Sequence, residues 1–382
     1  MYLDIIGSCN LKCPSCPMGN SQNNNYKKPM SIDVFSAIIK KAKTEKINSI
    51  HLYNWTEPLV HPKIGEFIDI TESNGINCGI SSNLNISKNI EEAIKSNPSF
   101  FRISLSGFNQ DIYKIGHAGG DIDIVKKNMI LLSELKSKYK SKTHIEVYYH
   151  RYLDNIDDED LMKEFSGQLG FSFSSGMSIM MPLEKVLAVV NSEESKISDE
   201  DKKIMERMVL PPSPEVIKLA SIHKKNPCTL KDDMLTLDAE GDTIICCSVF
   251  NQKKHSIGNY LNFSIDEIQK KKSTEPQCTS ICDSCMNKGL HVYAQSPHIF
   301  KDLGDINLIE HRIKKITNNK DLIISLRNGE KINHNGVAFD EILYLKLNPD
   351  VKIAVTNGLF EGGYDHYRKF GQFEKRKISN DN

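Results

Sequence analysis

Three cysteines near the start of the chain are spaced closely enough to bind a single metal centre. Cys9, Cys13 and Cys16 form a C-x3-C-x2-C pattern, in which Pro14 and Pro17 restrict the backbone. Cysteine thiolates hold iron–sulfur clusters, and a cubane cluster usually takes four of them. Three thiolates would leave one iron free to chelate the amino and carboxylate groups of a small ligand. A zinc site, or three unrelated buried cysteines, is the alternative interpretation.

A second group of cysteines lies much later in the chain. It consists of Cys228, Cys246, Cys247, Cys278, Cys282 and Cys285. A hairpin that carries two thiolates, together with a C-x2-C loop, can place four ligands around one further cluster. Four thiolates suit Zn²⁺ equally well, so a structural zinc site is the main alternative. The remaining cysteine, Cys78, lies in an apolar run and is expected to be a small buried residue.

The composition restricts the class of protein that carries these cysteines. The chain has 382 residues, of which 39% are hydrophobic and 26% charged, as in soluble proteins of two or three domains. Its 49 basic residues balance 49 acidic ones, so no nucleic acid and no membrane partner is expected. Neither a signal peptide nor an apolar run of about 20 residues is readable, which predicts a cytoplasmic protein. Thiols stay reduced in that compartment, so grouped cysteines are more often metal ligands than disulfides.

The first half of the chain alternates apolar strands with amphipathic helices. Short apolar runs predict strands over residues 2–6, 50–53, 76–81, 101–105, 145–149 and 171–180. Apolar residues at three-to-four spacing predict helices over 31–42, 64–73, 86–96, 122–135 and 158–169. This alternation implies an α/β fold with a parallel sheet, an open sheet or a partial barrel. Its chemistry is expected at the carboxyl ends of the strands, where the first cysteine group lies.

The first cysteine group, placed directly after the first predicted strand, resembles the signature of the radical S-adenosylmethionine (SAM) superfamily. This resemblance implies a partial (β/α)6 barrel, a [4Fe-4S] cluster on Cys9, Cys13 and Cys16, and S-adenosylmethionine bound to the open iron. It also implies reductive cleavage of that cofactor to a 5′-deoxyadenosyl radical. Ser15 departs from the aromatic residue that the family commonly has before its third cysteine.

Motifs at the following strand ends resemble the family's cofactor-binding stations. NWTEPLVHP, with Trp55, Thr56 and Glu57, resembles the Gly-Gly-Glu station whose backbone carbonyls meet the methionine amino group. Thr56 stands where glycine is usual. In YKIGHAGG, His117 occupies the position at which relatives often carry an arginine that is directed at the methionine carboxylate. The resemblance also assigns cofactor contacts to Ser82 and Asn83 in ISSNLN and to Ser104 in RISLSG.

The spacing that begins at Cys228 resembles a SPASM domain or the shorter twitch domain. Cys228, Gly241 and Cys246 match the C-x9-15-G-x4-C pattern, and no cysteine follows Cys285, which favours the one-cluster twitch form. On this resemblance an auxiliary [4Fe-4S] cluster would bind to Cys228, Cys246, Cys282 and Cys285. Cys247 and Cys278 are left over, and Cys278 could replace one of the four.

A strand rich in aromatic and basic residues is expected near the mouth of the barrel. In HIEVYYHRYL, alternation puts Tyr149 and Arg151 on one face, and Tyr148, His150 and Tyr152 on the other. One face should point into the barrel, so Arg151 or His150 is a candidate for binding a substrate hydroxyl or carboxylate. Bulky packing inside the barrel is the alternative.

These patterns predict that the chain has four parts. They are a barrel over residues 1–220, a twitch/SPASM domain over 221–300, a linker over 301–338 and a helical module over 339–382. In the second part, LTLDAEGDTIICC predicts a hairpin that turns at Gly241-Asp242. The last part contains YL-x2-NPDV and HY-x2-FG-x2-E-x-R, and with these motifs it resembles a module appended to bacterial enzymes of surface-polysaccharide synthesis. This resemblance implies a docking partner.

The resemblances together imply a radical SAM enzyme, an oxidoreductase, that abstracts a substrate hydrogen and passes an electron to the auxiliary cluster. A small polar, sugar-like or cyclitol-like substrate is expected. A peptide-modifying enzyme is one alternative, and a non-catalytic binding protein with zinc in the second cysteine site is another. The implied partners are the small polar molecule or peptide and a reducing protein such as flavodoxin or ferredoxin.

Overall fold

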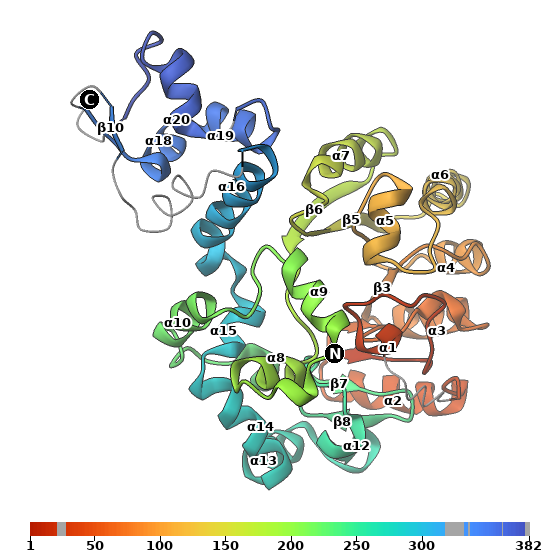
Figure 1. Ribbon diagram of the computed structural model, residues 1–382. Coiled ribbons are helices and arrows are strands. Elements are labelled where there is room, and N and C mark those ends of the chain that lie inside the picture. The colour runs from red at the N-terminus through yellow and green to blue at the C-terminus, as the bar shows by residue number, and fades with distance from the viewer. Residues whose placement is uncertain (21–27, 318–331, 335–336, 361, 379–382) are drawn as a thin grey trace. The chain divides into compact units, whose positions relative to one another are not determined.

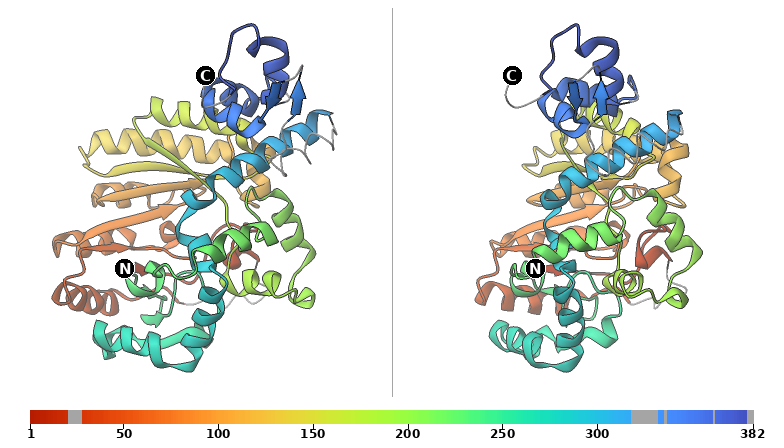
Figure 2. Two further views of the ribbon diagram at one scale, coloured as in Figure 1. Left: turned by 90° about the vertical axis from the view of Figure 1, so that its left-hand side faces the viewer. Right: turned by 60° about the vertical axis from the view of Figure 1, so that its left-hand side comes forward.

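Six parallel strands form the centre of the computed structural model (Figure 1). They pair side by side in chain order, and Figure 2 shows them from two further directions. Their bounds are β1 (Tyr2–Leu3), β2 (Ser49–His51), β3 (Asn77–Ser82), β4 (Phe100–Leu105), β5 (His144–Arg151) and β6 (Ser172–Met177). Each overlaps with a predicted strand, so the expected α/β fold with a parallel sheet is confirmed.

Helices connect these strands and bury one face against them. They are α2 (Ile32–Thr44), α3 (Ile64–Ser73), α4 (Ile90–Lys95), α5 (Gln110–Gly116), α6 (Ile122–Lys138) and α7 (Glu159–Gln168), with the single turn α1 (Pro17–Asn20) before them. In α2 the residues at three-to-four spacing, Phe35, Ile38, Ile39 and Ala42, are fully buried. Ser31 begins this helix, because its hydroxyl accepts the Val34 N–H over 3.3 Å. The apolar pattern that predicted the helices therefore also builds the core.

The second cysteine group lies in a segment that joins the same sheet. β7 (Thr236–Leu237) pairs in parallel with β1. β8 (Asp242–Ile244) pairs antiparallel with β7, and β9 (Ser256–Asn259) pairs antiparallel with β8. The hairpin was predicted, but its pairing with the first strand was not. The surrounding helices are α8 (Leu183–Val190), α9 (Asp199–Arg207), α10 (Pro214–Ile222), α11 (Thr229–Asp232), α12 (Gln252–His255), α13 (Ile265–Thr274), α14 (Pro276–Asn287) and α15 (Leu290–Gln295).

The structure describes all residues except 21–27, 318–331, 335–336, 361 and 379–382. It divides the chain into two units, Met1–Pro297 and His298–Asn382. The barrel and the second cysteine group share the first unit, and the boundary that we expected near residue 220 stays a prediction. Among the described helices, none has the length and apolar character needed to cross a membrane.

The second unit begins with a helix where a linker was expected. α16 (Lys301–Thr317) occupies the first half of the expected linker over 301–338, because apolar residues recur there at helical spacing, and 318–331 lies outside the described residues. The other elements are β10 (Ile332–His334), β11 (Val337–Phe339), α18 (Glu341–Leu347), α19 (Pro349–Thr356) and α20 (Gly363–His366). A small core of its own includes Phe339, Tyr344, Val351 and Val355.

Candidate functional site

A cavity of about 430 Å³ lies at the carboxyl ends of the six parallel strands. The loops after all six strands line it, as expected for this class of sheet. The three cysteines of the first group line it, and so does every residue to which we assigned a cofactor contact. Those residues are Cys9, Cys13, Cys16, Trp55, Thr56, Glu57, Ser82, Asn83, Ser104 and His117.

The loop that carries Cys9, Cys13 and Cys16 is tightly folded. The Leu11 N–H donates a hydrogen bond to Cys9 Sγ over 3.5 Å. A Cβ atom on Gly19 would lie 2.5 Å from the backbone nitrogen of Cys13, so the chain can pass there only with glycine. The fold thus holds the three thiols in the lining of the cavity.

Among the described residues, no positive group stabilises the thiolates of this loop. Burial, and next the charge of Glu57, raises the pKa of Cys9 to about 12. Burial raises the pKa of Cys16 and, together with the two neighbouring thiols, that of Cys13. Bound iron would supply the missing positive charge and stabilise the thiolates. The donor set therefore fits a cluster held by three cysteines.

A buried carboxylate shapes the loop that follows β2. Asp4 Oδ1 accepts the backbone N–H groups of Asn54, Trp55 and Thr56 over 2.8, 3.1 and 3.2 Å, and the Thr56 hydroxyl over 2.7 Å. Burial outweighs these hydrogen bonds and raises the pKa of Asp4 to about 6. With three successive N–H groups directed at Asp4, the loop is fixed in one conformation at the cavity. Sequence reasoning missed Asp4, although a lone acidic residue in the apolar start of the chain was a signal.

Glu57 joins the second strand loop to the third. Its carboxylate accepts the backbone N–H groups of Asn83 over 2.8 Å and Leu59 over 3.1 Å, and burial raises its pKa to about 7. The Asn83 side-chain amide donates to Asn10 over 2.9 Å and lies 3.8 Å from Cys9 Sγ. Glu57 thus connects the predicted cofactor stations to the cysteine loop.

Two serine–histidine pairs lie at the carboxyl ends of β4 and β5. His117 Nδ1 lies 2.9 Å from Ser106 Oγ, and its ring stacks on Tyr113 at 4.8 Å. His150 Nε2 lies 2.9 Å from Ser104 Oγ. Burial, and next the charge of His150, lowers the pKa of His117 to about 3. His117 is therefore neutral near pH 7, and it cannot replace the positive charge of an arginine.

The face of β5 that points into the cavity carries Tyr148 and His150, and Tyr152 follows directly after the strand. Arg151 lies on the opposite face and pairs with Glu159 through two contacts of 2.6 Å. Of the two candidates for substrate binding, His150 lines the cavity and Arg151 does not, because alternation along a strand directs neighbouring side chains to opposite faces.

Replacing Arg151 with alanine is expected to lower the stability of the fold and to leave the cavity unchanged. Glu159, with 10% of its side chain exposed, would lose a two-pronged partner, which should lower the free energy of unfolding by about 1–2 kcal/mol. Urea unfolding measures this loss, and Lys138→Ala, in an exposed pair with Glu91, is the control with little expected effect. Unchanged stability would contradict the structural role.

The second cysteine group surrounds a smaller apolar cavity. Cys228, Cys246 and Cys285 line it. Cys282 does not line it, but its charge couples to those of Cys246 and Cys228. The Ser248 N–H donates to Cys246 Sγ over 3.3 Å. The structure thus gathers the four predicted thiols in one region.

The two remaining cysteines of this group and a buried lysine lie around these thiols. Cys278 is fully buried on α14 and does not line the cavity. The Cys247 thiol lies outside the lining and interacts with Cys246, whose pKa it lowers. The Lys272 ammonium donates to the carbonyls of Lys231 and Met234 over 2.7 and 2.8 Å. This buried cation offsets negative charge on the thiolates.

Four residues line both cavities. They are Ile179, Met181, Tyr293 and Ala294. The Tyr293 hydroxyl donates to the Leu210 carbonyl over 2.7 Å, which fixes its ring between the two sites. The cavities lined by the first and second cysteine groups therefore adjoin one another.

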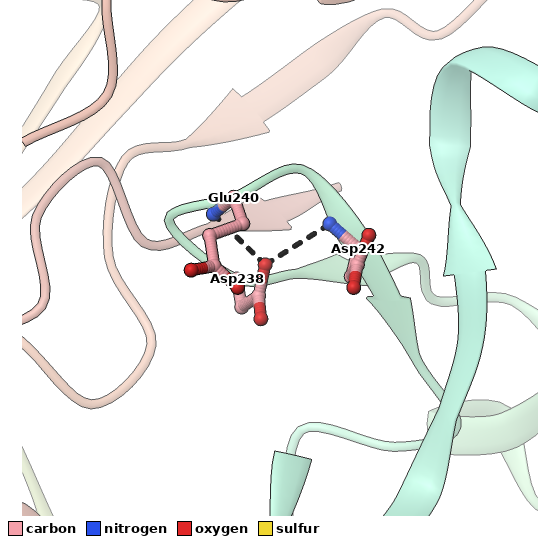
Figure 3. Close-up of side chains that lie close together, drawn as sticks. All are labelled: Asp238, Glu240 and Asp242. Carbon is pink, nitrogen blue, oxygen red and sulfur yellow. Dashed lines mark hydrogen bonds between the residues drawn. The ribbon is translucent and has the colours of Figure 1, made fainter. Parts of the chain in front are cut away.

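Three carboxylates near the second cysteine group belong to the hairpin turn between β7 and β8. Asp238, Glu240 and Asp242 bring their oxygens within 4.8 Å of one another. Figure 3 shows that Asp238 instead accepts the N–H groups of Glu240 and Asp242, over 2.9 and 3.0 Å. Gly241 takes a φ of 82°, which glycine allows at no steric cost. The acidic residues shape the predicted turn.

Comparisons with known proteins agree with this architecture. Residues 3–164 match the sequence model of the radical SAM superfamily. Streptococcus suis SuiB bound to its precursor peptide SuiA is similar, with a TM-score of 0.52 and 13% identity over 75% of this chain and 69% of that chain. SuiB alone gives a TM-score of 0.50 and 14% identity over 76% and 70%. BtrN in complex with AdoMet and 2-DOIA gives 0.41 and 15% over 76% and 87%. No curated protein matches the sequence.

Proposed function

We propose that the chain, whose residues 3–164 form a radical SAM domain, is an enzyme that oxidises a small polar molecule at a carbinol carbon. The domain implies a [4Fe-4S] cluster, for which Cys9, Cys13 and Cys16 are the ligands, and S-adenosylmethionine. When bound, these two cofactors supply a 5′-deoxyadenosyl radical that removes a hydrogen atom from the substrate.

The proposal of an oxidation rests on the residues that line both cavities. A carbinol that has lost a hydrogen atom from carbon must still lose one electron and one proton to become a carbonyl. A cluster on the second cysteine group would supply an electron acceptor, and it would lie beside the first cavity, because Ile179, Met181, Tyr293 and Ala294 line both cavities. Without such an acceptor, a radical enzyme would favour redox-neutral reactions.

We assign the role of proton acceptor to His150, which lines the cavity. Burial, and next the charge of Arg102, lowers the pKa of His150 to about 4, so the imidazole is neutral near pH 7 and can accept a hydrogen bond. Its partner Ser104 and its neighbours Tyr148 and Ser178 make this part of the cavity polar. Such a lining suits hydroxyl groups better than an apolar peptide side chain.

Replacing His150 with glutamine should separate the two halves of the reaction. Substrate oxidation should fall by about a hundredfold, the usual contribution of a positioned proton acceptor. Formation of 5′-deoxyadenosine without substrate should stay unchanged. Quantitative mass spectrometry of both products measures the split, and Arg151→Ala on the other face of β5 is the matched control. Equal loss of both products in His150→Gln would contradict the role.

Deuterium transfer tests the proposed function itself. The anaerobically reconstituted full-length chain is incubated with S-adenosylmethionine, dithionite, and sugars or cyclitols deuterated at their carbinol carbons. We expect deuterium in 5′-deoxyadenosine and a ketone product from at least one of them. Transfer from deuterated peptides alone would overturn the substrate class and favour peptide modification.

A further inference from the structure

A lysine is completely buried beside the second cysteine group. Lys272 lies on the buried side of α13 together with Ile268. α13 packs against α14, the helix that carries Cys282 and Cys285 (Figure 1). Lysine is almost never fully buried without a partner, because an ammonium in an apolar surrounding loses its hydration. The burial of Lys272 therefore calls for a negative charge nearby.

Backbone carbonyls hold the Lys272 ammonium beside the segment that follows Cys228. Nζ donates to the carbonyl oxygens of Lys231 and Met234 over 2.7 and 2.8 Å. Lys231 belongs to α11, which begins directly after Cys228, and Met234 comes just after that helix. Carbonyl groups orient an ammonium, but they carry no net charge that could neutralise it. The negative partner of Lys272 therefore lies elsewhere.

Two neighbouring lysines, whose charges also lower the pKa of thiols in this group, have carboxylate partners. Lys231 pairs with Asp232 over 3.9 Å, and Lys271 pairs with Glu275. Their positive charges are thus offset before they reach the thiols. Lys272 donates to carbonyls instead, so its charge acts on the second cysteine group in full.

Thiolates are the main negative charges that act on Lys272. Burial lowers its pKa, and the charge of Cys246 opposes this shift more strongly than the charge of Asp232, with Cys282 and Cys247 next. A cubane on four thiolates is negatively charged, and it becomes more negative when it accepts an electron. A fixed cation nearby therefore stabilises the reduced form more than the oxidised form.

We propose that Lys272 is the counter-cation of a cluster on the second cysteine group and raises its reduction potential, which favours electron transfer from the substrate radical. The inference rests on the proposed second cluster. In that step one electron passes from the carbon radical to the oxidised cluster, and one proton passes from the substrate hydroxyl to His150. Lys272 lines neither cavity, so it acts through the cluster and not on the substrate.

The reduction potential of the second site tests this role without any substrate, so the result is independent of the deuterium-transfer experiment. Changing Cys9, Cys13 and Cys16 to alanine leaves the second site alone, and this full-length parent is reconstituted to about four irons per chain. EPR of samples poised at stepwise potentials gives the midpoint. Lys272→Met and Lys272→Gln should each shift the one-electron equilibrium at least tenfold against reduction, which lowers the midpoint by about 59 mV.

Two further variants in the same parent separate the charge of Lys272 from its packing. Lys272→Arg keeps the charge and should hold the potential near that of the parent. Lys270→Met removes an exposed lysine of the same helix, where water and salt screen the charge, so the potential should change little. Lys272→Gln keeps an N–H donor for the carbonyls and removes the charge alone.

Each other outcome has a definite meaning. An unchanged or higher potential in Lys272→Gln, with its iron retained, would overturn the role of Lys272 and leave the second cluster standing. Loss of iron from Lys272→Gln and Lys272→Arg alike would show that the side chain is needed for structure, and would also overturn the proposal. A parent that binds no iron would overturn the second cluster and this inference with it.

Discussion

Changing Cys9, Cys13 and Cys16 together to alanine is expected to abolish the formation of 5′-deoxyadenosine. The three thiols line the cavity, and a cluster there would lose all of its protein ligands. Iron should fall from about eight to about four per chain, because the second site is retained. Iron and sulfide analysis, together with EPR of the reduced protein, measures this loss.

The control for this variant is Cys78→Ala. Cys78 is buried in β3 and lines neither cavity, so its loss should cost some stability and no iron. An unchanged iron content in the triple variant would show that the first group does not bind a cluster.

Asp4→Ala is expected to have the second-largest effect. It leaves three backbone N–H groups and the Thr56 hydroxyl without their acceptor in a buried place. At about 1–3 kcal/mol for each unsatisfied group, partly relieved by water, the free energy of unfolding should fall by roughly 3–5 kcal/mol. The loop that carries Trp55 and Glu57 would lose its fixed conformation, so affinity for S-adenosylmethionine should fall at least tenfold, which is about 1.4 kcal/mol.

Asp238→Ala separates the two effects of Asp4→Ala. Asp238 also accepts N–H groups of a turn, but it does not line the cavity. Its loss should lower stability in urea unfolding and leave affinity for S-adenosylmethionine unchanged in equilibrium dialysis. Unchanged affinity in Asp4→Ala itself would contradict its role in shaping the cofactor loop.

The raised pKa of Asp4 predicts a pH dependence of a definite sign. The value rises from 3.8 to about 6 on folding, so the folded state binds this proton more tightly. Its contribution to stability is therefore complete below pH 3.8 and is lost as pH rises through 6, by about 3 kcal/mol. Unfolding experiments between pH 4 and 7 should show wild type losing stability relative to Asp4→Asn. A constant difference between the two would contradict the shift.

The parallel strands and the first cysteine group could be predicted because their signals are local. Apolar runs gave β1 to β6, and the cysteine spacing identified the loop that lines the cavity. Alternation in β5 named two faces but not which one turns inward, so Arg151 and His150 stayed equal candidates until the strand was placed in the sheet.

Contacts between distant segments could not be predicted from periodicity. The pairing of β7 with β1 joins residues far apart in the sequence, and it brings Tyr293 and Ala294 to the cavity.

The central claim is that this cavity cleaves S-adenosylmethionine reductively. The most direct measurement is the amount of 5′-deoxyadenosine formed by the anaerobically reconstituted, dithionite-reduced full-length chain, with and without candidate sugars and peptides. We expect the wild type to accumulate 5′-deoxyadenosine with time and the variant without Cys9, Cys13 and Cys16 to stay at background. Equal amounts from the two proteins under every condition would contradict the claim.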